Sequence, residues 1–519
     1  MNNFDLRQEE EQKSASAVAA ARAADPKVFS LGEVVALVIR HPLASLSLLR
    51  LRHLRRLPAA LSKNGLSYLS GRAITHVKCN TISGYIWPLS LIFQNTPAEV
   101  RRLELERKYP GITRPVALSN LHALEQKLAR PQFRVSKKSP GVVNVLLPTL
   151  DPLLMFGGYI SCLHFIRRLQ ESGNRVRILL CEAREFDRLA VLKKLSRAPD
   201  LQATVERCDI QILFSEGEEK HDTYISPSDC FVSYSAWCSH KAHHLAQAVG
   251  RRFMFFVQEF EPIFHPFDST YALAASAYDL PHTALFNTDI LKEYFKTNGI
   301  GVFARYNDAE LAGSYAVYEH ALTPVSVPEL AELQARRKRR LLFYARPEDH
   351  ARRNLFEIGV MGLQIAVATG VFEGEWEFVG IGTLGYEGHL SLGHGCHLDC
   401  RSTLPQLDYA GALRGFDVGL SLMLAPHPSI LPFEMASAGQ IVVTNVFHNR
   451  SANLLRGISG NIEPCSPTPL SVSDALRAAV DRSRDGRARI AGTVFPWPRD
   501  WDSAFNDRVM AKALAMLQT

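Results

Sequence analysis

The sequence predicts an α/β protein with two facing Rossmann-like domains and a helical N-terminal extension. From residue 142 onward, short apolar runs rich in β-branched residues alternate with amphipathic helical patterns, which is typical of parallel sheets covered by helices. The alternation occurs in two successive series, and the basic run at 336–340 separates them. The chain of 519 residues is also too long for one hydrophobic core, so two or three domains are expected.

The composition is that of an ordinary soluble protein, with 46% hydrophobic and 21% charged residues. The net charge of +7 suits anionic partners such as nucleotide phosphates or an acidic membrane surface, but it is too small to indicate nucleic acid. The 9 cysteines follow no framework spacing, and the N-terminus lacks the apolar core of a secretory signal. We therefore expect a cytoplasmic protein without a transmembrane span, for which the inner face of the cell membrane is a further candidate location.

The N-terminal quarter of the chain differs in character from the rest. Residues 1–27 are predicted to be flexible, and residues 28–140 to form a basic helical extension that ends in a linker at 130–141. In residues 31–65, leucines and valines recur at helical spacing among five arginines. Such a helix either lies on an anionic membrane surface or packs on its own protein with its arginines extended into solvent.

The first alternating series predicts an N-terminal Rossmann-like domain over residues 141–325. The run at 142–148 is a buried parallel strand, followed by a loop, a glycine pair and an amphipathic helix that ends at Gly173. The remaining strands are expected at 175–182, 203–214, 229–237, 251–262 and 282–288, and the remaining helices at 239–250 and 289–299.

The second series predicts a C-terminal Rossmann-like domain over residues 326–519. The basic run at 336–340 is interpreted as its solvated entry. Strands are expected at 341–347, 376–382, 396–400, 417–424 and 440–446, and helices at 355–370, 404–415 and 429–439, with a final helix after the segment 497–501.

Ligands of open α/β sheets bind beyond the carboxyl ends of the strands, so the loops after strands hold the candidate site residues. Gly157 and Gly158 open a helix, where the backbone is able to approach an anion; a plain tight turn is as compatible with them. Arg346 ends a strand and Arg353 follows it, and a guanidinium fork suits a diphosphate unless it pairs with a nearby carboxylate.

The segment from 421 to 445 is nearly all apolar, yet it contains the carboxylate Glu434 near the start of a predicted helix, after His427 and Ser429. A helix N-terminus stabilises such a charge, and a carboxylate accepts hydrogen bonds from ligand hydroxyls such as those of a ribose. In the other domain, Gln258 and Glu259 follow a strand and are suited to hold sugar hydroxyls or act as a base, although a surface turn explains them too.

The segment 394–400 holds two cysteines, two histidines and an aspartate, but its spacing matches no zinc pattern, and no metal site is predicted there. The sequence also lacks a nucleophile elbow and the lysine motif of a P-loop.

Several of these segments, in order, resemble a known group of enzymes. The segment from Glu434 to Gly439 with the following strand to Asn445 is similar to the nucleotide-binding signature of GT-B glycosyltransferases of family 4. The segments FGGYISCLHF (156–165), VQEFEPIFHP (257–266), FYARP (343–347), RRN (352–354) and LSLMLAPHPSILPFEMASAG (420–439) resemble WsaF-type rhamnosyltransferases, over roughly residue 142 to the C-terminus.

The resemblance implies a GT-B fold with the acceptor mainly on the N-terminal domain and a nucleotide sugar, dTDP-L-rhamnose, on the C-terminal one. By this analogy Glu434 binds the sugar ring of the nucleotide, and Arg346 with His427 or Arg353 binds the diphosphate. Gln258 and Glu259 face the transferred sugar or the acceptor. No metal or other cofactor is implied, because basic side chains and helix dipoles offset the charge of the leaving group.

The sequence departs from the family pattern at Pro426, where many relatives carry a second glutamate eight residues before the one that matches Glu434. The expected function is transfer of rhamnose or a similar deoxysugar to a growing surface polysaccharide or lipid-linked glycan. The alternatives are another GT-B nucleotide-sugar enzyme such as an epimerase, and a non-catalytic protein that binds nucleotide sugars or a membrane.

Overall fold

The computed structural model describes residues 118–519 apart from residues 139, 156, 219–222 and 403–405. The predictions for the flexible start at 1–27 and for the basic segment 31–65 lie outside the described residues. Residues 121–519 form one compact unit, which contains both large sheets. Within the described residues each of these sheets has seven strands.

The first sheet has the order β4-β3-β2-β6-β7-β8-β9, and all of its neighbouring strands are parallel. Its strands are β2 (Val143–Leu147), β3 (Val176–Leu180), β4 (Asp209–Ile212), β6 (Cys230–Ser233), β7 (Phe253–Val257), β8 (His282–Asn287) and β9 (Tyr315–Tyr318). The helices between them are α9 (Gly157–Glu171), α10 (Arg188–Lys194), α11 (Pro199–Arg207), α12 (Ala236–Ala248), α13 (Ser269–Ser276), α14 (Asp289–Thr297), α15 (Val302–Arg305) and α16 (Asp308–Leu311). Two 3-10 helices, η1 (Glu261–Phe264) and η2 (Ala277–Asp279), complete this domain.

The first sheet is buried on both faces, as its continuous apolar strands require. In β2, Val143 and Val145 belong to a core cluster with residues of α9, whereas Leu146 belongs to a second cluster with residues of α12. Helix α9 begins with the glycine pair and ends before Gly173, whose φ of +82° favours glycine.

The second sheet has the order β12-β13-β11-β10-β14-β15-β16, and only β12 among its described strands is antiparallel to its neighbour. Its strands are β10 (Arg339–Tyr344), β11 (Trp376–Thr383), β12 (Gly388–Gly393), β13 (Cys396–Ser402), β14 (Val418–Leu420), β15 (Ile441–Asn445) and β16 (Ile462–Cys465). The accompanying helices are α17 (Leu330–Ala335), η3 (Asp349–Asn354), α18 (Phe356–Ala368), α19 (Gln406–Leu413), α20 (Leu431–Ser437), α21 (Ala452–Ile458), α22 (Pro469–Arg482) and α23 (Gly486–Ala491).

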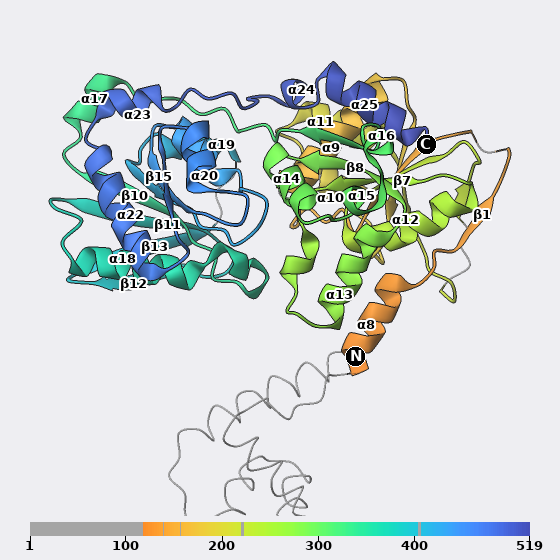
Figure 1. Ribbon diagram of the computed structural model, residues 1–519, viewed down its shortest axis with the longest axis horizontal. Helices are drawn as coiled ribbons and strands as arrows, with labels where there is room; N and C mark the ends of the chain where they lie inside the picture. Colours follow the sequence, from red (N-terminus) through yellow and green to blue (C-terminus); the bar gives the residue numbers. More distant parts are fainter. Residues whose placement is uncertain (1–117, 139, 156, 219–222, 403–405) are drawn as a thin grey trace, which may run out of the picture. The chain divides into compact units, whose positions relative to one another are not determined.

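The last two helices, α24 (Trp501–Ala504) and α25 (Asp507–Leu517), return to the first domain, as Figure 1 shows. Phe505, between them, stacks with Phe256 of β7 and contacts Tyr318 of β9, with ring centroids 6.4 and 4.4 Å apart. Arg168 of α9 forms an ion pair with Asp507 at 3.0 Å. With two α/β sheets and this returning helix, the chain has the expected GT-B fold.

Three local predictions are wrong. The stretch 130–141 is more than a linker, because β1 (Phe133–Val135) within it pairs in parallel with β5 (Thr223–Ile225). The expected strand at 203–214 begins as helix α11, and only Asp209–Ile212 is a strand. β-branched and apolar residues occur in both halves of that segment, so its pattern did not separate the helix from the strand.

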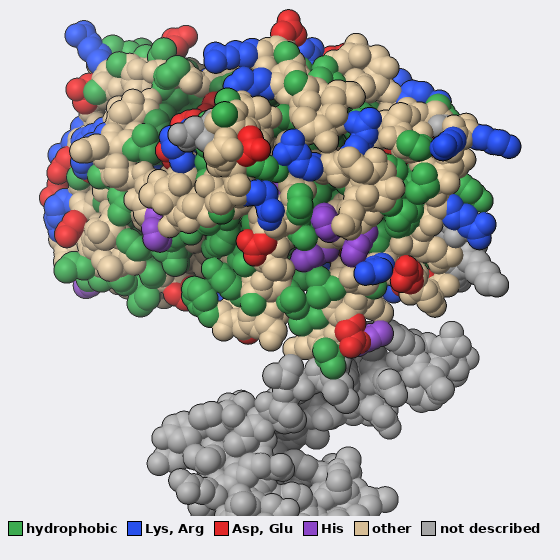
Figure 2. All heavy atoms as spheres, turned by 45° about the vertical axis from the view of Figure 1, so that its right-hand side comes forward, with side chains coloured by type: hydrophobic (Ala, Val, Ile, Leu, Met, Phe, Trp, Pro, Cys, Tyr) green, Lys and Arg blue, Asp and Glu red, His purple; other side chains and the backbone are tan. Residues whose placement is uncertain are grey.

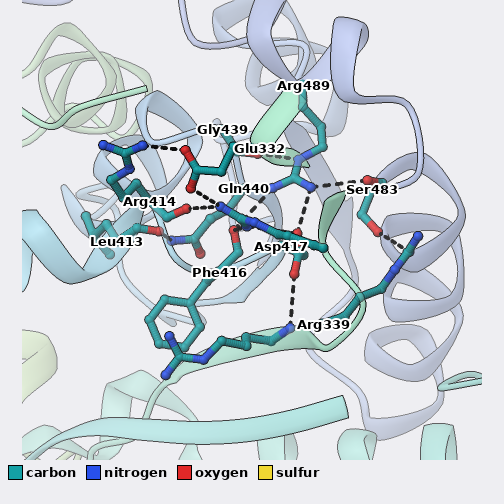
Figure 3. A network of polar contacts seen from close by, with 12 residues as sticks. Glu332, Arg339, Leu413, Arg414, Phe416, Asp417, Gly439, Gln440, Ser483 and Arg489 are labelled. Atoms are coloured by element: carbon teal, nitrogen blue, oxygen red, sulfur yellow. Dashed lines mark hydrogen bonds and ion pairs between the residues drawn. The ribbon is translucent and has the colours of Figure 1, made fainter. Parts of the chain in front are cut away.

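The third concerns the basic run at 336–340, which is not simply a solvated entry. Arg339 and Arg340 already belong to β10, and Arg336 donates to the Asp417 carboxylate at 3.0 Å. Arg489 of α23 donates to the same carboxylate oxygen at 2.8 Å, and Figure 3 shows the guanidinium group of Arg489 turned toward Asp417. Asp417 and Arg489 are almost fully buried, so their ion pair fixes the start of β14 against α23.

The described residues on the face seen in Figure 2 form no single basic patch. On the face seen in Figure 2, Lys and Arg side chains are interspersed with Asp and Glu and with apolar residues. The described residues on this face therefore do not form the concentrated basic stripe that a nucleic-acid-binding protein presents.

Candidate functional site

The candidate site lies where loops at the carboxyl ends of strands from the two sheets meet. Glu259 follows β7 in the first domain, and His427 follows β14 in the second. The backbone N–H of His427 donates to Oε1 of Glu259 at 3.2 Å. The structure therefore brings together two residues predicted from different domains.

Glu259 is a buried carboxylate with a shifted pKa. Its Oε1 also accepts from the backbone N–H of Phe260 at 2.9 Å. Burial raises the pKa of Glu259 to about 6, although Arg353 and Arg450 favour its ionised form. A carboxylate that titrates this close to neutrality is suited to accept a proton from a sugar hydroxyl.

Gln258 is held at both ends of its amide. Its Nε2 donates to the hydroxyl of Tyr318 at 2.8 Å, and its Oε1 accepts from Nδ2 of Asn287 at 3.0 Å. The Tyr318 hydroxyl lies 2.5 Å from the Ser161 hydroxyl of α9. Gln258 is therefore fixed in one orientation, which favours a positioning role over direct participation in proton transfer.

The glycine pair lies next to this network. A Cβ atom on Gly158 would lie 2.5 Å from the hydroxyl of Tyr234 and 3.7 Å from Oε1 of Gln258. A Cβ atom on Gly157 would meet only His320, at 3.5 Å from its Nε2. The close approach of the Tyr234 hydroxyl thus requires glycine at 158, whereas the space at 157 is less restricted. Both residues stand at the N-terminus of the 15-residue helix α9.

His427 is a buried, neutral hydrogen-bond donor. The backbone N–H of Ser429, a residue with φ of +61°, donates to its Nδ1 at 3.1 Å, so the ring proton is on Nε2. Burial lowers the pKa of His427 to about 3, and the nearby His320 and Arg450 lower it further. Its Nε2–H has no hydrogen-bond partner in the part of the chain that the structure describes.

The two arginines predicted to bind a diphosphate differ in how many of their hydrogen-bond donors are already used within the protein. Arg346 is engaged by its neighbours, with bonds to the Tyr344 hydroxyl at 3.0 Å, Glu348 at 3.1 Å and His350 at 2.8 Å. Arg353 packs its guanidinium over the Phe264 ring at 4.7 Å, and its buried Nε lacks a partner among the described residues. Arg353 is therefore the better candidate for an anion ligand.

Arg450 is a site residue that the sequence analysis missed. It is fully buried, and it donates to the carbonyl groups of His427 at 3.1 Å and Met423 at 2.6 Å, thereby supporting the loop after β14. Its Nε has no partner within the described residues. Because it follows β15 by five residues, the strand-end rule applied to this loop would have found it.

Glu434 lies in α20 with only 6% of its surface exposed. Its Oε1 accepts from the backbone N–H of Thr323 at 3.0 Å, and the nearby Tyr409 hydroxyl, which has no hydrogen-bond partner among the described residues, favours the ionised form. Burial raises the pKa of Glu434, against the lowering effect of these donors. In this structure the carboxylate of the apolar segment is thus paired inside the protein, through neutral donors rather than cations.

Two surface hollows lie away from these residues. One of about 440 Å³ includes Arg175, Arg177 and Asp229, and another of about 560 Å³ includes Trp376 and His397. Both open at the amino ends of their strands. Among the described residues there is no group of three potential metal ligands, and no helix there has the length and apolarity to cross a bilayer.

A curated relative and several solved structures are similar to the chain. The O-antigen biosynthesis protein RfbC of Myxococcus xanthus is 30% identical over 270 residues, which is 50% of this chain. The chain spans only 19% of the length of that relative. HepE of Anabaena, solved with UDP and glucose, is 11% identical at a TM-score of 0.48, over 72% of this chain and 100% of its own. The glycosyltransferase WaaG is 12% identical at 0.43, over 72% and 98%.

Two family matches cover the two domains in order. Residues 142–289 match the family described as "WsaF, N-terminal domain", and residues 339–477 match "WsaF, C-terminal domain". Together the matches cover more than half of the chain and include most of the site residues described above. The chain therefore belongs to the WsaF family.

Proposed function

We propose that the protein is a GT-B glycosyltransferase that moves a deoxysugar, L-rhamnose from dTDP-L-rhamnose, onto a growing surface polysaccharide or lipid-linked glycan. The observation that carries this proposal is a set of buried donor atoms that have no partner among the described residues. They are Nε of Arg353, Nε of Arg450 and Nε2 of His427, and His427 is bonded to the Glu259 carboxylate. Buried donors are costly when unsatisfied, so a ligand rich in acceptor oxygens is the natural occupant. The name of the relative from Myxococcus xanthus supports a polysaccharide product.

The proposed reaction needs positive charge beside the departing diphosphate and a base beside the acceptor. Arg353, the Nε2–H of His427 and the N-terminus of α9 at Gly157 and Gly158 supply the first. Glu259 supplies the second, because its pKa of about 6 leaves it mostly ionised at neutral pH yet able to hold a proton. In this assignment Gln258 positions the sugar, while Arg346 and Ser429 support the loops.

Glu434 is assigned to the ribose of the nucleotide. Its carboxylate already interacts with Thr323 and Tyr409. A ribose hydroxyl would therefore donate a hydrogen bond to the carboxylate beside these groups, or would take the place of one of them. Both partners are neutral, so the exchange leaves no cation unpaired.

The first test measures the thermal stability of the purified protein against dTDP-, UDP- and GDP-sugars. A ligand that binds the native state raises the melting temperature with its saturation. A shift with dTDP and dTDP-rhamnose alone supports the proposed donor, whereas a shift only with UDP- or GDP-sugars refutes rhamnose but retains a nucleotide-sugar site. No shift with any nucleotide refutes the proposal and favours a non-catalytic protein.

The second test replaces Glu434 with Ala and follows donor affinity by calorimetry. We expect donor affinity to fall at least tenfold while the circular dichroism spectrum is retained, since a hydrogen bond to a charged group contributes about 1.5–3 kcal/mol. Unchanged affinity would refute the role of Glu434. Release of nucleoside diphosphate only with added glycan acceptor would distinguish a transferase from an epimerase, which converts donor alone.

The proposed contact with an acidic membrane through residues 31–65 needs its own test, because that segment is outside the described residues. Full-length protein should co-sediment with vesicles that contain anionic lipid, and binding should weaken as salt rises. Equal binding to neutral vesicles would contradict the electrostatic part of this proposal.

A further inference from the structure

His320 is a buried histidine in the connection that leaves β9, and the site described so far does not use it. It is 7% exposed, its ring packs against Trp501 at an angle of 45° with centroids 4.7 Å apart, and its Nε2 lies 3.5 Å from where a Cβ atom of Gly157 would stand. The ring therefore points toward the first residue of α9. Within the described part of the chain, Nδ1 of His320 has no hydrogen-bond partner.

A second buried histidine interacts with His320 from the other domain. His427 is electrostatically coupled to His320, and its Nε2–H is likewise without a described partner. Arg450 donates to the carbonyl group of His427 at 3.1 Å, and the charges of Arg450 and Arg353 help to lower the pKa of His427. A helix N-terminus, two imidazoles and two cations thus belong to one region, which also contains two carboxylates. Oε1 of Glu259 accepts from the backbone N–H of His427, and Oε1 of Glu319, next to His320 in the chain, accepts from the backbone N–H of Asp289 at 2.9 Å.

We propose that His320 is a further ligand of the diphosphate of the nucleotide sugar, and that it takes up a proton when the diphosphate binds. This inference rests on the proposed function, since it assigns one more residue to the same donor site. It differs from the role given to His427, which binds as a neutral donor.

The two histidines differ because of their second ring nitrogen. Nδ1 of His427 already accepts from the Ser429 N–H, so a proton there would break that bond. Nδ1 of His320 has no such donor facing it. His320 is therefore the member of the pair that is free to become an imidazolium.

The free protein keeps His320 neutral. Burial lowers its pKa to about 3, and His164 of α9, which stacks on the same Trp501, lowers it further. A unit negative charge at about 4 Å favours the imidazolium by about a thousandfold at an effective dielectric constant of 20. A diphosphate carries at least two such charges, enough to move the titration of His320 to near neutral pH.

The test is calorimetric titration of the full chain at pH 6.5 with dTDP and, separately, with inorganic pyrophosphate, each in two buffers of different ionisation enthalpy. The difference between buffers gives the number of protons taken up. We expect the protein to take up about one proton when dTDP binds, because a ligand that raises the pKa of a group increases the number of protons that the group holds. In the His320→Gln variant, uptake should vanish and the Kd should rise about tenfold or more, as for loss of a charge-assisted bond.

His164→Gln is the matched control, because His164 is equally buried and loses a stack on the same tryptophan. It should keep both the uptake and the Kd of the wild type. Similar melting temperatures of the two variants would show that the His320 effect is not a folding defect. The same uptake with pyrophosphate would locate the effect at the diphosphate rather than the nucleoside.

Four results would overturn the inference. If dTDP binds the wild type without proton uptake, or if His320→Gln retains the uptake, the role of His320 is wrong while the proposed function stands. If pyrophosphate shows uptake and dTDP binds without it, the diphosphate at His320 does not belong to the nucleotide. If no nucleoside diphosphate binds at all, the proposed function fails together with the inference.

Discussion

Replacement of Glu259 with Gln should stabilise the protein at neutral pH. Glutamine keeps the side-chain oxygen that accepts from Phe260 and His427, but it carries no charge. The pKa of Glu259 rises from 4.5 to about 6 on folding because the carboxylate is buried. At about 1.36 kcal/mol per pKa unit, its ionisation costs the folded state about 2 kcal/mol above pH 6.

The sign of the pH dependence follows from the raised pKa. Between pH 4.5 and 6 the folded protein binds the proton of Glu259 more tightly than the unfolded chain does. The corresponding stability is therefore fully present below pH 4.5 and is lost as the pH rises through 6. The Glu259→Gln variant should be more stable than the wild type by about 2 kcal/mol at pH 7.5 and equal to it at pH 4.5.

Urea denaturation at pH 4.5, 5.5, 6.5 and 7.5, followed by tryptophan fluorescence, measures this difference. Glu206→Gln, at an exposed position of α11, serves as the control and should show no such trend. A difference that is constant with pH, or a variant less stable than the wild type at pH 7.5, would refute the reasoning. If Glu259 is the base of the proposed reaction, the stabilised variant should also lose at least a hundredfold in transfer rate.

Three further predictions concern packing and buried charge. Gly158→Ala should cost about 1–3 kcal/mol in unfolding free energy and weaken nucleotide binding, because its Cβ would lie 2.5 Å from the Tyr234 hydroxyl. Gly157→Ala, whose Cβ makes only an ordinary contact with His320, should leave the unfolding free energy nearly unchanged. Asp417→Asn should lower the unfolding free energy by about 3–5 kcal/mol, since buried Arg489 loses its counter-ion; adding Arg489→Met should recover part of this, and no recovery would contradict the explanation.

Much of the fold was predictable because its signals are local. Each buried parallel strand is a short apolar run, such as Val143–Leu147, and most helices between strands have an amphipathic pattern with a glycine after the last turn. The strand-end rule likewise led to Glu259 and His427, which the structure joins by a hydrogen bond. Where local signals were mixed, as at 203–214, the boundary between helix and strand was predicted wrongly.

The partners of the site residues were not predictable in this way. No spacing rule connects Glu434 with Thr323, which precedes it by 111 residues, or Arg450 with the carbonyl group of His427. Such contacts depend on how the loops fold back after the strands. The same limit explains why Arg346 was predicted to bind a ligand although Glu348 and His350 already engage it.

The partners of buried carboxylates separate structural from functional charges in this protein. Asp417 faces two guanidinium groups, so its charge is compensated and it holds the domain together. The carboxylate oxygens of Glu434 and Glu259 accept hydrogen bonds only from neutral groups, and burial raises the pKa of both. A buried carboxylate without a directly bonded cation destabilises the fold that contains it. Such a carboxylate stands at the carboxyl end of each sheet. This is best explained by a ligand whose hydroxyl groups donate hydrogen bonds or a proton to these two side chains.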